Sequence, residues 1–261
     1  MTERDHASVV KYMDAHIGEL LALLKDLKID EETIVFFASD NGASNEGRHS
    51  YEFFNSSGGL KGFKRSKNEG GVRSPSMVRW PGTIQPAKSS FQWAFWDMLP
   101  TFADLAGAAV PEGLDGVSIV PTLLGQTQDP KPYIYHTWTQ DRNLAAELPV
   151  DWVSRQNYQG LLEYVNTETG EVSSTHPLEE NNDPANKQLG FGIRIGDWKG
   201  IVQNCGDSNA PSKDDVYQIF DLSVDPFETN DIASTAEGQS RRSQFIDLIL
   251  QQNVSCNCFQ C

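Results

Sequence analysis

An acidic residue, an amide and a glycine follow an apolar, β-rich run early in the chain. The run is Val35–Ala38, and after Ser39 the chain continues with Asp40, Asn41 and Gly42. A carboxylate and a side-chain carbonyl are hard oxygen donors that suit Ca²⁺ or Mg²⁺, and buried strands of α/β sheets deliver ligands at their carboxyl ends. The same triplet is also typical of a turn that closes a strand. Asp40 and Asn41 are therefore candidate metal ligands, with a plain turn as the alternative.

Basic residues gather a little further along the chain. Between residues 61 and 80 there is a single acid, Glu69, against six basic residues: Lys61, Lys64, Arg65, Lys67, Arg73 and Arg79. Glycines flank the lysines, and glycine permits close approach of the backbone to a ligand. A local positive patch can attract an anionic ligand that the acidic protein as a whole would repel. The segment therefore predicts an anion site, with a solvated basic loop as the alternative.

The elements that must position these residues alternate between helix and strand. Apolar residues recur at spacings of three and four over residues 6–28, which predicts a helix, and a strand is expected at 33–38. A second strand is expected at 72–80, ended by a Pro-Gly pair. Asp97 is expected to cap a helix that stops at Gly107, and a short helix is expected at 119–124. This order favours an α/β sheet flanked by helices.

The composition changes after about residue 125. Residues 126–131 are polar and include a proline, which is typical of a linker. Beyond them we expect strands at 133–138, 190–202 and 216–222 and a terminal amphipathic helix at 238–252. The sequence therefore predicts two domains: a larger α/β domain over 1–125, and a smaller α+β domain over 126–261 with an antiparallel sheet, a polar insertion and a cysteine-rich tail.

Length and charge exclude several classes of protein. The chain has 261 residues and a formal net charge of −15, which disfavours binding to nucleic acid because such binding rests on neutralising phosphates. No apolar run approaches the 18 or so residues of a membrane span. The residues after Met1 are charged, so we expect no secretory signal in this sequence.

Taken together and in order, the motifs resemble the sulfatase family, the formylglycine-dependent sulfuric ester hydrolases of the alkaline-phosphatase-like superfamily. The resemblance covers roughly residues 8–125 and 190–235. It is carried by Ser39-Asp40-Asn41-Gly42, a Lys-containing glycine-rich loop, Glu69-Gly70-Gly71-Val72-Arg73, Arg79-Trp80-Pro81-Gly82, Arg194-Ile195-Gly196-Asp197-Trp198-Lys199 and Ile219-Phe220-Asp221-Leu222. It implies hydrolysis of sulfate esters by a partial alkaline-phosphatase-like domain, with a sulfated small molecule or carbohydrate as the ligand.

The resemblance also implies roles for individual residues. Asp40 and Asn41 match the pair that ligates the divalent cation, usually Ca²⁺, with Mg²⁺ as the alternative. Lys64 matches the lysine that contacts the sulfate group, and Lys61 is a weaker candidate for the same contact. His49 lies where a subset of relatives places a histidine that could meet the substrate, and a solvated loop histidine is the alternative.

Two parts of the family pattern have no match in this sequence. The family forms its nucleophile, formylglycine, from a Cys or Ser with Pro or Ala two residues on and Arg four residues on, and no Cys or Ser here fits. The paired N-terminal aspartates that complete the metal shell are also absent. We therefore expect a C-terminal portion of a sulfatase, inactive without the missing N-terminal half. A non-catalytic binder of sulfated ligands and a phosphatase or phosphodiesterase of the same superfamily are the alternatives.

The resemblance bears on compartment and on the cysteines as well. It implies an extracellular, periplasmic or lysosomal location for a full-length parent, and there disulfides are expected to form. Cys256, Cys258 and Cys261 lie at the tail and Cys205 further upstream. A disulfide arrangement is favoured over a zinc site, which would need all four cysteines in suitable geometry.

Overall fold

The computed structural model of the chain describes residues 3–44, 49–141, 152–156, 162–173, 187–205 and 217–255. Contacts group the chain into two compact units that interleave along the sequence. The first comprises Met1–Ile134, Ile193–Lys199 and Phe220–Asn230, and the second Tyr135–Gly192, Gly200–Ile219 and Asp231–Cys261. The domain boundary near residue 125 stays a prediction. The predicted cysteine tail, residues 256–261, lies outside the described residues.

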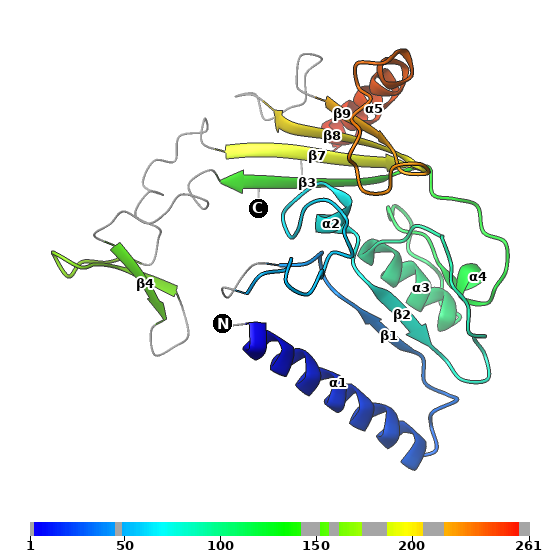
Figure 1. Cartoon of the computed structure of the whole chain (residues 1–261). Coiled ribbons are helices and arrows are strands. Elements are labelled where there is room, and N and C mark those ends of the chain that lie inside the picture. The colour runs from blue at the N-terminus through cyan, green and yellow to red at the C-terminus, as the bar shows by residue number, and fades with distance from the viewer. Residues whose placement is uncertain are drawn as a thin grey trace. The chain divides into compact units, whose positions relative to one another are not determined.

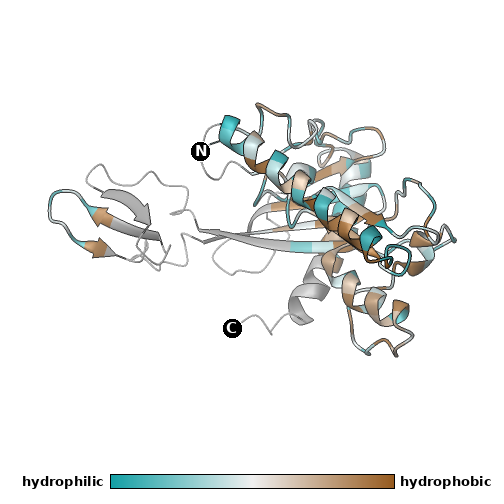
Figure 2. Ribbon diagram, turned by 90° about the horizontal axis from the view of Figure 1, so that it is seen from below, coloured by the Kyte–Doolittle hydropathy of each residue, from teal (hydrophilic) through white to brown (hydrophobic). Residues whose placement is uncertain are grey.

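The first helix, α1, spans Glu3–Asp26 and confirms the helix predicted over 6–28 (Figure 1). None of its residues is buried. Several of its apolar side chains are exposed to solvent, Val9 by 56% and Leu20 by 63%, whereas Ile17, Leu21 and Leu24 are half-buried. Figure 2 shows apolar and polar residues interspersed along the helix. No helix in the described part of the chain is long and apolar enough to cross a membrane.

Strand β1 spans Val35–Ala38 and pairs antiparallel with β2, Ser76–Arg79, in the register Val35↔Arg79 and Ala38↔Ser76. The strand predicted at 72–80 is shorter than expected. Its first residue belongs to a helical turn, α2 (Glu69–Val72), which is closed by a 2.8 Å bond from the Arg73 N–H to the Glu69 carbonyl. β1 was expected to be buried but is half-buried on both faces. These two strands form a separate two-stranded sheet.

Two helices follow β2 in the first unit. They are α3, Met98–Leu105, and α4, Val120–Leu123, which confirm the helices predicted after Asp97 and at 119–124. Asp97 stands at the N-cap of α3 as expected, but its side chain makes no cap hydrogen bond to that helix. Its carboxylate instead accepts bonds from the Ala94 N–H at 2.7 Å, the Val117 N–H at 2.9 Å and the Lys131 ammonium at 2.6 Å. The residue therefore ties three loops together.

A four-stranded sheet has the order β3-β7-β8-β9 (Figure 1). The strands are β3 (Ile134–Asp141), β7 (Lys187–Ile195), β8 (Trp198–Cys205) and β9 (Tyr217–Asp221). The segment 190–202, predicted as one strand, contains two, because Gly196 with φ +58° and Asp197 form a two-residue hairpin turn. Buried side chains of these strands include Phe191, Ile193, Ile201 and Phe220. The sheet therefore carries the main apolar core.

The remaining elements lie in the second unit. A three-stranded sheet has the order β4-β5-β6, formed by β4 (Trp152–Gln156), β5 (Leu162–Asn166) and β6 (Val172–Ser173). The terminal helix α5, Ala236–Ser255, confirms the helix predicted over 238–252. Its Phe245 is fully buried, and an ideal Cβ on Gly200 of β8 would lie 2.8 Å from that ring. Glycine at this position therefore lets the helix pack directly on the strand.

Candidate functional site

The segment after β1 carries the two predicted metal ligands. Asp40 is exposed and Asn41 half-buried. The Asn41 side-chain amide donates a 3.1 Å bond to the carbonyl of Gly42, which leaves its own carbonyl oxygen as an acceptor. Two adjacent oxygen donors at a solvent-accessible strand end fit a hard divalent cation. They supply only part of a shell of about six to eight oxygens, and the described residues contain no cluster of three or more His, Cys, Asp or Glu that could hold a metal alone.

Glycines allow close backbone packing where this segment meets the loop of residues 61–71, at Gly42, and inside the loop, at Gly70 and Gly71. The N–H of Gly42 donates to the Gly71 carbonyl at 2.9 Å, and the N–H of Gly70 donates to the Lys61 carbonyl at 2.8 Å. An added Cβ at Gly42 would overlap the carbonyl oxygen of Gly70. Added Cβ atoms at Gly70 and Gly71 would likewise overlap backbone carbonyls of the loop. Each glycine is therefore required for close backbone approach and not for an unusual φ angle.

Lys64 joins the same junction through its backbone. Its N–H donates to the carbonyl of Ala43 at 2.6 Å, and its side chain is half-buried. Lys64 is thus hydrogen-bonded to a residue that follows Asn41 by two positions in the chain. The structure therefore brings together the backbone segments that carry the predicted metal ligands and the predicted sulfate contact.

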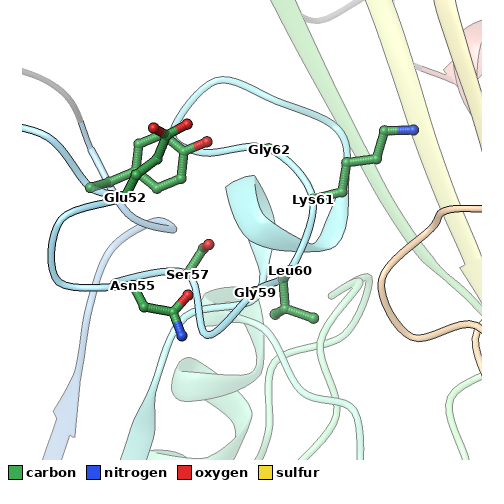
Figure 3. A pocket seen from close by; sticks show the side chains of 8 residues that line it. Glu52, Asn55, Ser57, Gly59, Leu60, Lys61 and Gly62 are labelled. Carbon is green, nitrogen blue, oxygen red and sulfur yellow. The ribbon is translucent and has the colours of Figure 1, made fainter.

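Lys61 lies on the same loop but its ammonium is engaged elsewhere. It donates a 3.1 Å bond to the carbonyl of Glu228 and lies 5.3 Å from the centre of the Phe220 ring. Figure 3 shows its side chain pointing away from Glu52 and Ser57. These contacts favour a structural role, and a contact between Lys61 and sulfate stays a prediction.

A hollow of about 370 Å³ lies on the loop just before Lys64 (Figure 3). It is lined by polar and apolar groups from one continuous segment, among them Tyr51, Glu52, Asn55, Ser57 and Leu60. Its volume is within the range of small-ligand pockets. Both a carboxylate, Glu52, and a lysine, Lys61, belong to its lining.

His49 stacks on His6 of α1, with ring centres 4.0 Å apart and planes 7° from parallel. Its Nδ1 is buried and has no hydrogen-bond partner among the described residues. Burial, together with the neighbouring His49 ring, lowers the pKa of His6. The ring of His49 is thus packed against the first helix and is not simply solvated, and its contact with a substrate stays a prediction.

A buried ion cluster, which we define as Glu69, Arg194, Lys199 and Glu228, lies beside the loop. The carboxylate of Glu69 accepts the Lys199 ammonium at 2.7 Å and the Arg194 guanidinium at 2.8 Å. Glu69 is 2% exposed, and Lys199 and Glu228 are both 0% exposed. Glu228 accepts the backbone N–H of Glu69 at 2.7 Å, and its other oxygen lies 3.8 Å from the Lys199 ammonium. All four residues belong to the first unit.

The two carboxyl groups of the cluster differ in their electrostatics. Burial alone would raise the pKa of Glu69, but Lys199, Arg194 and Arg73 together hold that pKa below its ordinary value. Burial dominates at Glu228 and raises its pKa, with the nearby Glu69 carboxylate acting in the same direction. Glu69 is therefore the ionised partner of the cations, and Glu228 is the group that resists ionisation.

The ion cluster was not predicted as part of the site. Glu69, Arg194 and Lys199 occur in the motifs that carry the family resemblance, but without an assigned contact. The available signal was the charged Lys199 inside Trp198–Val202, which otherwise reads as a buried strand. A lysine among apolar strand residues requires a buried partner. Nothing in the sequence identified that partner as Glu69, 130 residues away.

Two family models match the chain. One is the model "Sulfatase", over residues 4–108, and the other is "N-sulphoglucosamine sulphohydrolase, C-terminal", over residues 61–188. The first includes Asp40, Asn41 and the whole 61–71 loop. Together the two matches extend over most of the first unit's continuous N-terminal stretch and into the second unit.

Curated relatives show the same likeness. The chain is 35% identical over 139 residues to N-acetylgalactosamine-6-sulfatase of Canis lupus familiaris, which covers 50% of this chain and 25% of the relative. It is 40% identical over 124 residues to arylsulfatase A of Bos taurus, which covers 47% of this chain and 24% of the relative. It is 38% identical over 128 residues to steryl-sulfatase of Homo sapiens, covering 47% and 22%. The match thus spans about a quarter of each relative's length.

Solved structures share the fold over nearly the whole chain. One, in complex with its substrate D-glucosamine-2-N,6-O-disulfate, is 22% identical with a TM-score of 0.56, covering 95% of this chain and 40% of that one. The phosphonate monoester hydrolase of Agrobacterium radiobacter is 18% identical with a TM-score of 0.55, covering 93% and 39%. At these identities the likeness concerns the fold alone.

Proposed function

Because the chain belongs to the sulfatase family, we propose that it supplies the metal-binding and sulfate-binding part of a centre that hydrolyses sulfate esters. Its fold is the corresponding part of the α/β alkaline-phosphatase-like fold. One observation carries the proposal. The segment with Asp40 and Asn41 is hydrogen-bonded through Gly42 and Ala43 to the loop that carries Lys64.

In this proposal each residue has a distinct task. Asp40 and Asn41 hold Ca²⁺, or Mg²⁺, through a carboxylate and an amide oxygen. The Lys64 ammonium contacts the sulfate oxygens and stabilises the charge that develops as the S–O bond breaks. The formylglycine of the family would supply the nucleophile when present. Its precursor motif is absent from this sequence, so we propose that a polypeptide segment outside this sequence provides it together with the other metal ligands.

The substrate class and the compartment are parts of the same proposal. A sulfated carbohydrate or a sulfated small molecule fits, because a fold neighbour is described with a disulfated glucosamine and relatives are named for galactosamine, steryl and aryl sulfates. We propose an extracellular, periplasmic or lysosomal location. The acidic net charge of −15 argues against nucleic acid as a partner.

Hydrolysis of a chromogenic aryl sulfate, with the matching aryl phosphate alongside, tests the proposal. The chain alone is expected to turn over neither ester. The protein that unites it with the nucleophile segment is expected to cleave the sulfate. In that protein Lys64→Ala should lower kcat/KM for the sulfate by on the order of 10²-fold, as for other removed electrostatic contacts. The exposed Lys88 gives a matched control, and Lys88→Ala should leave kcat/KM unchanged.

The outcomes separate the competing functions. Cleavage of the phosphate alone would identify a phosphatase or phosphodiesterase of the superfamily. Binding of inorganic sulfate by calorimetry, weakened by Lys64→Ala and without turnover of either ester, would identify a non-catalytic binder. Equal kinetics of Lys64→Ala and the parent protein would remove Lys64 from the site.

A further inference from the structure

The ammonium of Lys199 is a buried charge with no access to a ligand. The side chain is 0% exposed, and its Nζ lies 2.7 Å from one carboxylate oxygen of Glu69 and 3.8 Å from one of Glu228. A buried ammonium is retained only where close partners compensate its desolvation. Those partners lie on two other segments of the first unit, so Lys199 connects β8 to α2 and to the loop after β9.

Glu69, which pairs with Lys199, is also hydrogen-bonded through its own backbone. Its carbonyl accepts the Arg73 N–H at 2.8 Å, and its own N–H donates to the Glu228 carboxylate at 2.7 Å. Glu228 also accepts the Lys61 ammonium on its carbonyl. The side chain and the backbone of Glu69 are therefore both fixed, and Glu228 contacts both Lys61 and Glu69 of the loop.

Glu228 itself has an unfavourable backbone conformation. Its φ of +55° lies in the left-handed region, which non-glycine residues seldom adopt. Such a conformation costs free energy and persists where the surrounding contacts over-determine it. The contacts with Glu69, Lys199 and Lys61 fix Glu228 in this conformation.

A short hydrogen-bonded path leads from Glu69 to the candidate site. From Glu69 the chain passes through Gly70 to Gly71, whose carbonyl accepts the Gly42 N–H at 2.9 Å. Across the loop, the Lys64 N–H reaches the Ala43 carbonyl at 2.6 Å. A Cβ added at Gly42 would overlap the carbonyl oxygen of Gly70, so the two segments have little room to shift relative to each other.

We infer that Lys199 is a positioning residue: through Glu69 it holds the 61–71 loop against the segment after β1 and so sets how Lys64 faces Asp40 and Asn41. Lys199 does not touch the ligand. The functional meaning of this position rests on the proposed function, but the mechanical link is a property of the chain alone and is testable without a substrate.

Amide hydrogen exchange in the full 261-residue chain tests the link. The variant is Lys199→Met, which removes the ammonium and keeps an unbranched side chain. The reporters are the amides of Gly42 and Lys64, and the reference is the Ala106 amide, which bonds to Phe102 at the end of α3. We expect the protection factors of both reporters to fall about tenfold or more relative to the reference, because removing one partner of a buried ion pair costs several kcal/mol.

Three further variants sharpen the result. Glu69→Gln, which keeps the side-chain volume, should produce the same selective loss of protection. It replaces Lys199→Met in the test if that variant folds poorly. Lys199→Arg restores a cation and should recover part of the protection. Arg241→Met breaks an exposed ion pair with Glu237 and should change neither reporter.

Uniform loss of protection at the reporters and the reference would overturn the inference, since a purely structural role lowers global stability and nothing else. Unchanged protection of Gly42 and Lys64 in Glu69→Gln would overturn it as well. Neither result depends on catalysis. Absence of sulfate-ester hydrolysis would refute the proposed function and leave this inference standing.

Discussion

Gly42→Ala is the sharpest test of the backbone contact on which the candidate site rests. Gly42 is not among the residues with positive φ, so an alanine meets no conformational penalty there. The obstacle is space alone. The added Cβ would overlap the Gly70 carbonyl oxygen and lie 2.7 Å from the Gly70 carbonyl carbon and 2.9 Å from that of Gly71. These are backbone atoms, which cannot rotate aside as a side chain does.

The cost follows from the geometry. Overpacking by one methyl group costs about 1–3 kcal/mol, and the upper end applies here because two backbone segments must separate. Gly18 provides the matched control, because it lies in α1 with nothing within 4 Å of an added Cβ. Gly18→Ala should stabilise the chain by about 0.5–1 kcal/mol through helix propensity. Replacing glycine by alanine is thus expected to lower the free energy of unfolding at position 42 and to raise it at position 18.

Urea titrations followed by circular dichroism measure both effects. With an m-value of about 3 kcal/mol/M for a chain of this size, Gly42→Ala should lower the unfolding midpoint by up to about 1 M, and Gly18→Ala should raise it slightly. A Gly42→Ala midpoint equal to that of the unmodified chain would refute the close approach of the two segments, and with it the placement of Asp40 and Asn41 beside the loop.

Three other predictions concern buried charges. The pKa of Glu69 is depressed in the folded state. Its carboxylate therefore stabilises the fold above about pH 4.5, the ordinary value, and this stabilisation is lost as the pH falls through the folded-state pKa. Glu69→Gln should flatten the dependence of the unfolding free energy on pH in this acid range. The raised pKa of Glu228 has the opposite sign: stability falls as the pH rises through its folded-state pKa. Glu228→Gln should therefore gain stability relative to the parent as the pH rises above about 4.5, the ordinary value. Lys131→Met should destabilise the chain by about 3–5 kcal/mol, because it leaves the fully buried Asp97 carboxylate without its cation. Arg241→Met, which breaks an exposed ion pair, should cost no more than about 0.5 kcal/mol. A loss as small as that for Lys131→Met would contradict the reasoning.

Local patterns along the chain predicted most of the individual elements. The three-and-four spacing of apolar residues identified α1, and the Asp-Asn-Gly triplet marked the end of β1. The same patterns misjudged burial. The spacing that predicts an amphipathic helix does not reveal whether its apolar stripe is covered, and in this chain Val9 and Leu20 face solvent.

Patterns of residue type also missed the distant partners of a side chain. Asp97 stands at a helix cap and its carboxylate accepts the nearby Ala94 N–H, but it also bonds to Val117 and Lys131, which are 20 and 34 residues away. A capping prediction weighs only the neighbouring N–H groups. It cannot weigh an ammonium brought in by a later loop, which in this case is the stronger, charge-assisted partner.

By itself the sequence determined which residue types are present for a cation and an anion: Asp40, Asn41 and Lys64, with glycines that permit close approach. Only the tertiary structure decided that Gly42 lies against Gly70 and Gly71, and that Lys199 is the partner of Glu69 across 130 residues. The physical reason is range. Turn chemistry and hydrophobic periodicity act over a few residues, whereas a buried ion pair forms wherever the folded chain brings opposite charges out of water together.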